Sequence, residues 1–131
     1  MSISTTPEVP TTQACRPKPS LPERDLIAPH EADRLGSIFK MLAHPTRLRL
    51  IHALIREGDV HVSDLAEEVG MAVQAVSNQL QRLADAGLVD RRSEGPFVFY
   101  RVIDPCVPVL IERGWCHVEE YPTPEQEVRG V

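Results

Sequence analysis

Apolar residues recur with a helical period through the middle of the chain. The first series follows the i, i+3, i+4, i+7 spacing, which predicts a helix over about residues 30–42. Pro45 stands where a helix accepts proline, at its first position, and a second helix is predicted from there to about Arg56, with Gly58 ending it. The two series are Leu35, Ile38, Phe39 and Leu42, then Leu48, Ile51, Leu54 and Ile55.

The next segment predicts two helices that follow each other closely. Residues 60–62 alternate like a very short strand, and Ser63 is the predicted N-cap of a short helix over residues 64–69 that Gly70 closes. A fourth helix follows after two or three residues. One stripe of this helix is predicted to be apolar, and it consists of Val73, Val76, Leu80, Leu83 and Gly87. Two helices joined so closely form a helix-turn-helix arrangement.

Two strands and a last helix complete the predicted fold. The segment LVDRRSEGPFVFYRVI predicts a hairpin that turns at Glu94, Gly95 and Pro96, and Pro105 starts a final helix. The order is therefore helix, helix, strand, helix, helix, hairpin, helix. This order predicts a mostly α-helical fold with a small β-hairpin wing (α+β), the winged helix-turn-helix.

Composition changes at both ends of the chain. Residues 1–28 hold five of the twelve prolines and little periodic hydrophobicity, which predicts a disordered N-terminal arm. Residues 29–121 are the predicted winged helix-turn-helix domain, and residues 122–131 a flexible tail. No apolar run approaches the roughly 20 residues that span a bilayer, and no secretory signal is recognisable. Together with three widely separated cysteines, this indicates a cytoplasmic protein without a membrane partner.

The distribution of charge restricts where nucleic acid could bind. The net charge is −5, and residues 102–131 alone carry six acidic and two basic groups. A DNA surface must therefore depend on a local cluster of residues. No Gly-rich phosphate loop occurs and the five histidines show no paired nucleophile spacing, so an enzyme is not expected.

Polar side chains on the fourth helix are the candidate DNA-binding residues. Those off its apolar stripe are Gln74, Ser77, Asn78, Gln79 and Arg82. Gln and Asn can bond adenine bidentately, and Arg can bond guanine or phosphate. Basic residues on the hairpin, Arg91, Arg92 and Arg101, suit phosphate contacts. The alternative is an ordinary solvated helix face and a charged strand surface.

Several motifs, in order, resemble the winged-helix repressors of the ArsR/SmtB family. MLAHPTRLRLIHAL is similar to the family's second-helix signature, and VSDLAEEVGMAVQAVSNQLQRLADAGLV to its helix-turn-helix. The resemblance covers roughly residues 31–120 and implies a homodimer that binds double-stranded operator DNA. One departure concerns the start of the fourth helix, where the family often has a capping Ser and this chain has Met71 and Ala72.

The resemblance also implies where a metal ion would bind. Some family members use a Cys-x-Cys pair before the third helix, but the matching positions here are His61 and Ser63, so this site is expected to be absent. Others use the pattern D-x-H-x10-H-x-x-E/H on the last helix. Four residues fit that spacing, with Cys in place of the first His: Asp104, Cys106, His117 and Glu120.

The spacing of these four residues requires two chains. Cys106 and His117 are eleven residues apart, about 16 Å along a helix, yet eleven steps of about 100° return to nearly the same face. Two such helices packed antiparallel about a two-fold axis would bring Asp104 and Cys106 of one chain to His117 and Glu120 of the other, giving two identical sites. The donor set suits zinc, with cadmium, nickel or cobalt as further possibilities.

The sequence thus predicts a metal-responsive repressor that dissociates from its operator when zinc or a similar divalent ion binds at the dimer interface. One alternative keeps the fold but makes Cys106 and Cys116 a thiol or redox switch, or a site for arsenic-type ligands. A second alternative is a winged helix used for protein contact without DNA. A third regards the four residues as an N-cap, a small core residue and a polar helix end.

Overall fold

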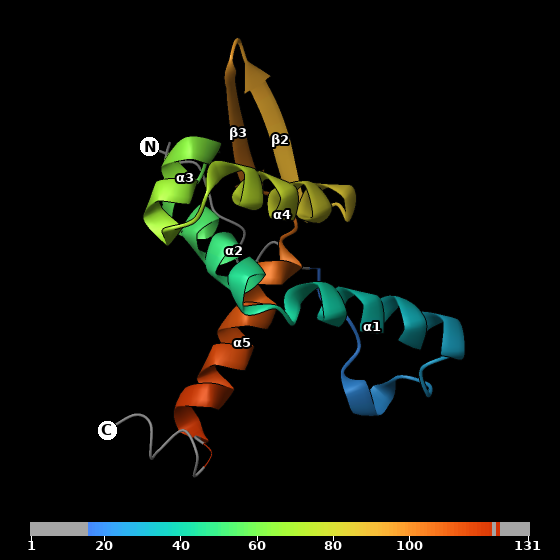
Figure 1. Ribbon diagram of the computed structural model, residues 1–131. Coiled ribbons are helices and arrows are strands. Elements are labelled where there is room, and N and C mark those ends of the chain that lie inside the picture. Colours follow the sequence, from blue (N-terminus) through green and yellow to red (C-terminus); the bar gives the residue numbers. More distant parts are fainter. Residues whose placement is uncertain (1–15, 122, 124–131) are drawn as a thin grey trace, which may run out of the picture.

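The computed structural model describes residues 16–121 and 123, and its element order is the predicted one (Figure 1). The helices of the winged domain are α1 (Pro29–Leu42), α2 (Pro45–Glu57), α3 (Val62–Val69), α4 (Val73–Asp85) and α5 (Cys106–Glu120). The strands are β1 (Val60–His61), β2 (Val89–Glu94) and β3 (Phe97–Val102). The predicted winged helix-turn-helix is therefore confirmed.

The core lies where α2, α3 and α4 pack on one face of the sheet. Its largest buried side chain is Tyr100, which is only 1% exposed. The helices contribute chiefly Leu50, Ile51, Leu54, Leu65, Val76, Leu80 and Leu83. This core fixes α4 against the hairpin, so the predicted DNA-reading helix and the wing belong to one packed unit.

The sheet has the order β1-β3-β2, with both pairs antiparallel. β1 pairs with only two residues of β3, Val60 opposite Tyr100 and His61 opposite Phe99. The β2–β3 hairpin continues beyond them and stands out from the body as the wing (Figure 1). The distal part of the wing is therefore a two-stranded ribbon.

Three local predictions were wrong. Gly87, which was placed on the apolar stripe of α4, lies beyond the end of the helix and has a φ of 81°. The structure starts α3 at Val62, and the N-cap is His61, whose Nδ1 accepts a hydrogen bond from the Ser63 backbone N–H at 3.3 Å. The imidazole thus does what was expected of the Ser63 hydroxyl. Val73 was placed on the buried stripe of α4 but is 45% exposed, because it occupies the first turn, outside the contact with the core.

The helix ends follow the sequence closely. Gly58 and Gly70 terminate α2 and α3 with positive φ angles of 89° and 72°. Residues that carry a Cβ adopt such angles only at a cost in free energy. Pro45 is the first residue of α2, as predicted. None of the described helices is long and apolar enough to cross a membrane.

Part of the predicted arm is described. It contains a 3-10 turn, η2 (Leu21–Glu23), closed by a hydrogen bond from the Ser20 backbone N–H to Glu23 Oε1 at 3.1 Å. Residues 1–15, and residues 122 and 124–131 of the predicted tail, lie outside the described residues. Disorder of the arm and of the tail stays a prediction.

Candidate functional site

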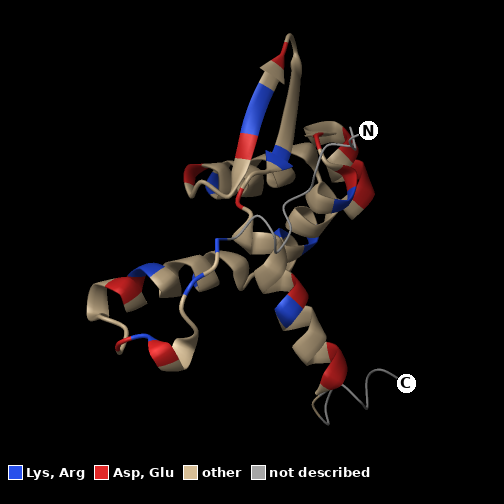
Figure 2. Cartoon of the chain, turned by 180° about the vertical axis from the view of Figure 1, so that it is seen from behind, with Lys and Arg blue, Asp and Glu red and all other residues tan. Residues whose placement is uncertain are grey.

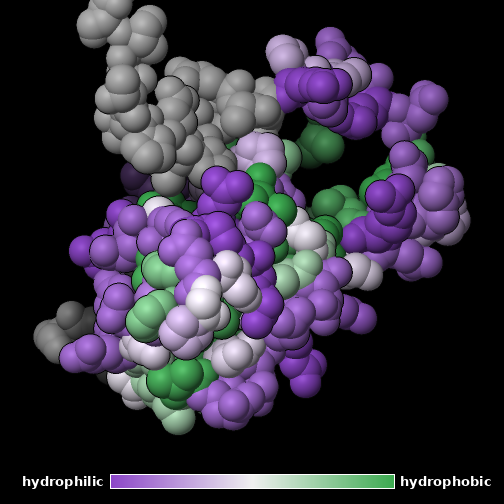
Figure 3. Space-filling view, turned by 90° about the horizontal axis from the view of Figure 1, so that it is seen from above, coloured by the Kyte–Doolittle hydropathy of each residue, from purple (hydrophilic) through white to green (hydrophobic). Residues whose placement is uncertain are grey.

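The exposed face of α4 brings three of the predicted DNA-binding residues together. Gln74, Asn78 and Arg82 are spaced by four residues and all are exposed. Gln74 Nε2 donates a hydrogen bond to Asn78 Oδ1 at 3.0 Å, so the two amides lie side by side. Residues at this spacing share one helix face. Figure 3 views the end that carries the wing and shows hydrophilic surface with small apolar patches.

The other two predicted residues on α4 are half-buried. Gln79 Oε1 accepts a hydrogen bond from Arg47 Nε at 2.8 Å, across the contact between α2 and α4. Arg47 also donates through Nη1 to the Met41 carbonyl at 3.3 Å. Gln79 is thereby held toward the body of the protein, and Ser77 is only partly accessible. The N-cap of α4 is Ala72, which makes no side-chain hydrogen bond, in line with the departure noted in the sequence.

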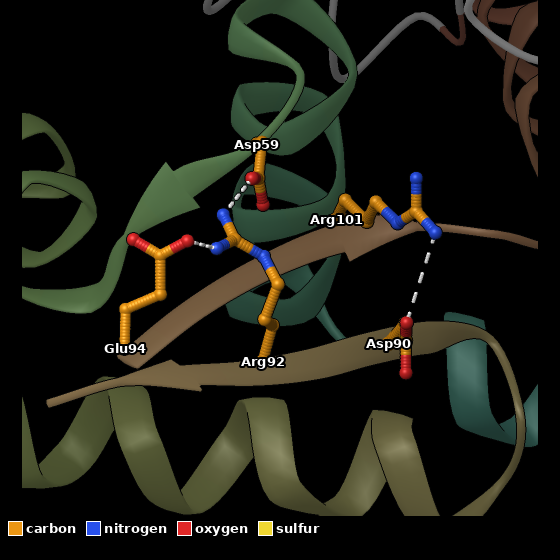
Figure 4. Close-up of polar contacts among 5 residues, drawn as sticks. All are labelled: Asp59, Asp90, Arg92, Glu94 and Arg101. Atoms are coloured by element: carbon orange, nitrogen blue, oxygen red, sulfur yellow. Dashed lines mark hydrogen bonds and ion pairs between the residues drawn. The ribbon is translucent and has the colours of Figure 1, made fainter. Parts of the chain in front are cut away.

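On the wing, two of the three arginines are paired with carboxylates. Arg92 Nη2 is ion-paired with Asp59 and its Nη1 with Glu94 (Figure 4). Arg101 Nη2 lies 3.8 Å from Asp90 Oδ2. Within residues 16–121 and 123, Arg91 forms no ion pair. Figure 2 shows the result, a basic band on β2 with acidic residues on either side of it.

The four predicted metal ligands lie at the two ends of α5. Asp104 Oδ1 accepts a hydrogen bond from the Cys106 backbone N–H at 2.8 Å and so caps the helix from just outside it. The helix is continuous over its 15 residues, although it contains Pro108 and Gly114. Cys106, His117 and Glu120 are exposed. Among the described residues of this single chain, no group of three or more His, Cys, Asp or Glu side chains could hold a metal ion.

The C-terminal half of α5 leaves an apolar face open. Trp115 is 49% exposed although its ring meets His52 edge-on, with 5.1 Å between the ring centroids. Val118, Leu48 and Phe39 are also partly or half exposed. These side chains line a groove of about 670 Å³ between α1, α2 and α5. The apolar series predicted for the first helix does lie on α1, but within one chain only part of it is buried.

The start of α3 carries His61 and Ser63. His61 Nδ1 is engaged with the Ser63 backbone N–H. Its ring also lies edge-on against Phe97 and Phe99, with 5.1 and 5.4 Å between the ring centroids. His61 therefore has a local structural role in capping and packing.

Comparison with known proteins assigns the chain to a family. A family model described as the MarR family matches residues 44–96, from the start of α2 to the wing turn. The cadmium resistance transcriptional regulatory protein CadC homolog of Staphylococcus aureus is 30% identical over 98 residues, which are 75% of this chain and 80% of that protein. The chain belongs to the ArsR/SmtB family of winged-helix transcriptional regulators.

Two solved structures extend this assignment. The antimony-specific transcriptional repressor AntR is 53% identical, with a TM-score of 0.72, and the match covers 82% of this chain and 96% of that one. The homodimeric winged helix-turn-helix domain of Mb0332 from Mycobacterium bovis, described as a possible ArsR-family regulator, is 28% identical. Its TM-score is 0.62, and the match covers 75% of this chain and 93% of that one. Proteins of this ArsR/SmtB type are regulators and not enzymes.

Two residues that matter for this regulator's sites could not be found from the sequence. Arg47 is 32 residues from Gln79, and Asp59 is 33 residues from Arg92. Local periodicity carries no signal for such pairs. The sequence carried one signal against a strongly basic wing, because the carboxylates of Asp59 and Glu94 offset part of its positive charge.

Proposed function

We propose that this ArsR/SmtB chain is a homodimeric repressor that releases double-stranded operator DNA when zinc or a similar divalent ion binds between two copies. The ligands are Asp104, Cys106, His117 and Glu120. The observation that supports this most strongly is their placement at opposite ends of one continuous helix beside an uncovered apolar face. The ligands present in one chain are too far apart, and the surface that would receive a second chain is open.

The distance along α5 excludes a site built by one helix. Cys106 and His117 are the first and twelfth of its 15 residues, which separates them by about 16 Å at roughly 1.5 Å per residue. Zinc–ligand bonds are only about 2.0–2.3 Å long. In an antiparallel pair of α5 helices, the start of one helix lies beside the end of the other. Two symmetric sites with four ligands each then form.

The open groove supports the second copy. Apolar residues on α5 and α1 lie half-exposed, and burying them against a partner removes apolar surface from water. Two of the proposed ligands, Cys106 and His117, lie on the side of α5 that also carries Leu110, at the edge of the apolar face that lines the groove. The homodimeric state of Mb0332 is consistent with such a pairing.

The donor set defines which ions fit. Thiolate, imidazole and two carboxylates are four protein ligands, the number that tetrahedral zinc accepts. Asp104 Oδ1 accepts a hydrogen bond from the Cys106 backbone N–H, and this hydrogen bond fixes the carboxylate next to the thiol. The thiolate also raises affinity for softer ions such as cadmium, and nickel and cobalt accept the same donors.

DNA contacts are proposed for the exposed face of α4 and for the wing. Gln74, Asn78 and Arg82 are placed to reach base edges and phosphates, with Ser77 at the edge of this face. Gln79 Oε1 accepts a hydrogen bond from Arg47, so a contact of Gln79 with DNA would use its Nε2 amide. An ion that ties two α5 helices together fixes the separation of the two α4 helices, and operator half-sites require about 34 Å. A separation different from this lowers the affinity for DNA.

The test is a zinc titration of the protein bound to a duplex that the purified protein has enriched from a random-sequence pool. Zinc should weaken binding by about 5–150-fold, the usual range of coupling between two sites. Cys106→Ser should abolish this effect while leaving metal-free DNA binding unchanged. Cys116→Ser is the matched control on the same helix and should keep most of the response. No enriched duplex, or an equal zinc response in Cys106→Ser, would contradict the proposal.

A second candidate signal is favoured by one observation. AntR is 53% identical and is described as antimony-specific. Cys106 and Cys116 are both exposed on α5, and soft ions prefer thiolates. If the inducer is an antimony- or arsenic-type ion, Cys116→Ser should abolish release as fully as Cys106→Ser, and His117→Ala should retain it. For the zinc site the expected results are reversed: Cys116→Ser should retain release and His117→Ala should abolish it.

A further inference from the structure

We propose that Arg92 is the residue that positions the wing, and that Arg91 makes the wing's phosphate contact. This inference rests on the proposed DNA binding and assigns separate roles to two adjacent basic residues that look equivalent in the sequence. The assignment follows from which face of β2 each side chain occupies and from what each one touches.

Arg92 spans the whole sheet. It lies on the edge strand β2 directly opposite Phe99 of the central strand, and Phe99 in turn is opposite His61 on β1. The guanidinium sits over the Phe99 ring, 4.7 Å from its centroid, and reaches Asp59 just before β1 (Figure 4). One side chain thus connects the two outer strands across the middle one.

The partners of Arg92 also make it a poor phosphate ligand. Asp59 and Glu94 each accept from one terminal nitrogen, so this group of three charges has a net charge of −1. A phosphate approaching Arg92 would meet both carboxylates. The side chain is 43% exposed, so the ion pairs add little to global stability. Their main consequence is the orientation of the wing.

The wing needs such a contact because most of it has no third strand. β1 pairs only with Phe99 and Tyr100, so β3 beyond Phe99 is bonded only to β2. An isolated two-stranded ribbon is marginally stable in water. Arg92 lies opposite Phe99, at the last register that β1 covers, and its side chain reaches back to Asp59 just before β1. It thus ties the ribbon to the body of the protein and fixes the direction in which the wing points.

Arg91 lies on the other face of the same strand. Successive side chains of a strand alternate, so Arg91 shares its face with Val89, which is buried in the core that α4 helps to form. Asp90 and Arg92 project away from α4 (Figure 4). Arg91 therefore extends the α4 side of the wing, is exposed, and forms no ion pair within the described residues. It is placed beside the DNA that α4 would contact.

Two measurements on the full-length chain test this division, with Arg91→Gln and Arg92→Gln as a matched pair. The first is amide hydrogen exchange of the hairpin in the protein without DNA. Arg92→Gln and Asp59→Asn should each accelerate exchange in the distal hairpin, and Arg91→Gln should not. This measurement requires no DNA, so it tests the positioning role separately from the proposed function.

The second measurement is the salt dependence of binding to the selected duplex. Binding weakens as salt rises, so the slope of log K against log salt is negative, and removing one phosphate contact reduces its magnitude by about 0.9. Arg91→Gln should reduce the magnitude of the slope by that amount per copy. Arg92→Gln should weaken binding severalfold with the slope unchanged. The inference is overturned if Arg92→Gln reduces the magnitude of the slope as Arg91→Gln does, if it leaves the affinity unchanged, or if hairpin exchange is the same in Arg92→Gln, Asp59→Asn and the parent protein.

Discussion

Replacing Trp115 by Ala should weaken the proposed dimer without unfolding the protomer. Trp115 is 49% exposed in one chain and lines the apolar groove beside α5. A tryptophan side chain has about 200–250 Å² to bury, so roughly 100–125 Å² remain for a partner. At about 25 cal/mol per Å², this area corresponds to about 2.5–3 kcal/mol in each copy.

Symmetry doubles the effect, because each dimer contains two copies of the residue. The upper limit is therefore about 5–6 kcal/mol, and half of it already raises the dimer Kd by about 100-fold. Sedimentation equilibrium over a range of protein concentrations measures this constant directly. Thermal unfolding followed by circular dichroism checks that the protomer remains folded, since the substitution also removes the ring contact with His52.

Phe97→Ala is the matched control for this prediction. Phe97 is an aromatic residue of similar exposure, 53%, but it lies on the wing, outside the groove. The control should leave the dimer Kd unchanged. An unchanged Kd in Trp115→Ala, or an equal rise in Kd in both variants, would refute the assignment of the groove to the dimer interface.

Three further predictions concern DNA reading, the helix-turn-helix and the arm. Replacing Gln74, Asn78 and Arg82 together by Ala should abolish sequence-specific binding in fluorescence anisotropy with the dimer intact, and retained specificity would reject this surface. Gly70→Ala should lower the free energy of unfolding by about 1–2 kcal/mol in denaturant titrations, because its φ of 72° strains any residue with a Cβ; an unchanged free energy would contradict this. Deleting residues 1–26 should leave zinc-driven release unchanged, and an abolished response would place a ligand in the arm.

Local features of the sequence were enough to predict the fold. Pro45, Gly58 and Gly70 act through the backbone of their own segment, so the ends of α2 and α3 follow from residue type alone. The exceptions have different causes: Val73 lies outside the contact of α4 with the core, whereas His61 competes locally with Ser63. The imidazole of His61 took the capping role expected of Ser63 because its Nδ1 reaches the Ser63 backbone N–H two residues away.

The candidate sites were less predictable, because they depend on pairing across the fold. Arg91 and Arg92 look equivalent in the sequence, and only the strand register with Phe99 and the approach of Asp59 separate them. The helical period placed Gln79 on a polar face, but it could not show that Arg47 binds it. The spacing of the metal ligands indicated a second chain, whereas the open groove beside α5 is visible only in three dimensions.

The most direct test of the proposed metal site is the zinc stoichiometry of a mixed dimer. One chain carries Cys106→Ser and the other His117→Ala, with two different affinity tags allowing the heterodimer to be isolated. Each proposed site takes Asp104 and Cys106 from one chain and His117 and Glu120 from the other, so both substitutions fall in one site and the second keeps all four ligands. Competition with a chromogenic zinc chelator should therefore detect one tightly bound zinc per heterodimer and none in either mutant homodimer. Absence of all tight binding in the heterodimer would contradict a site shared between the two chains.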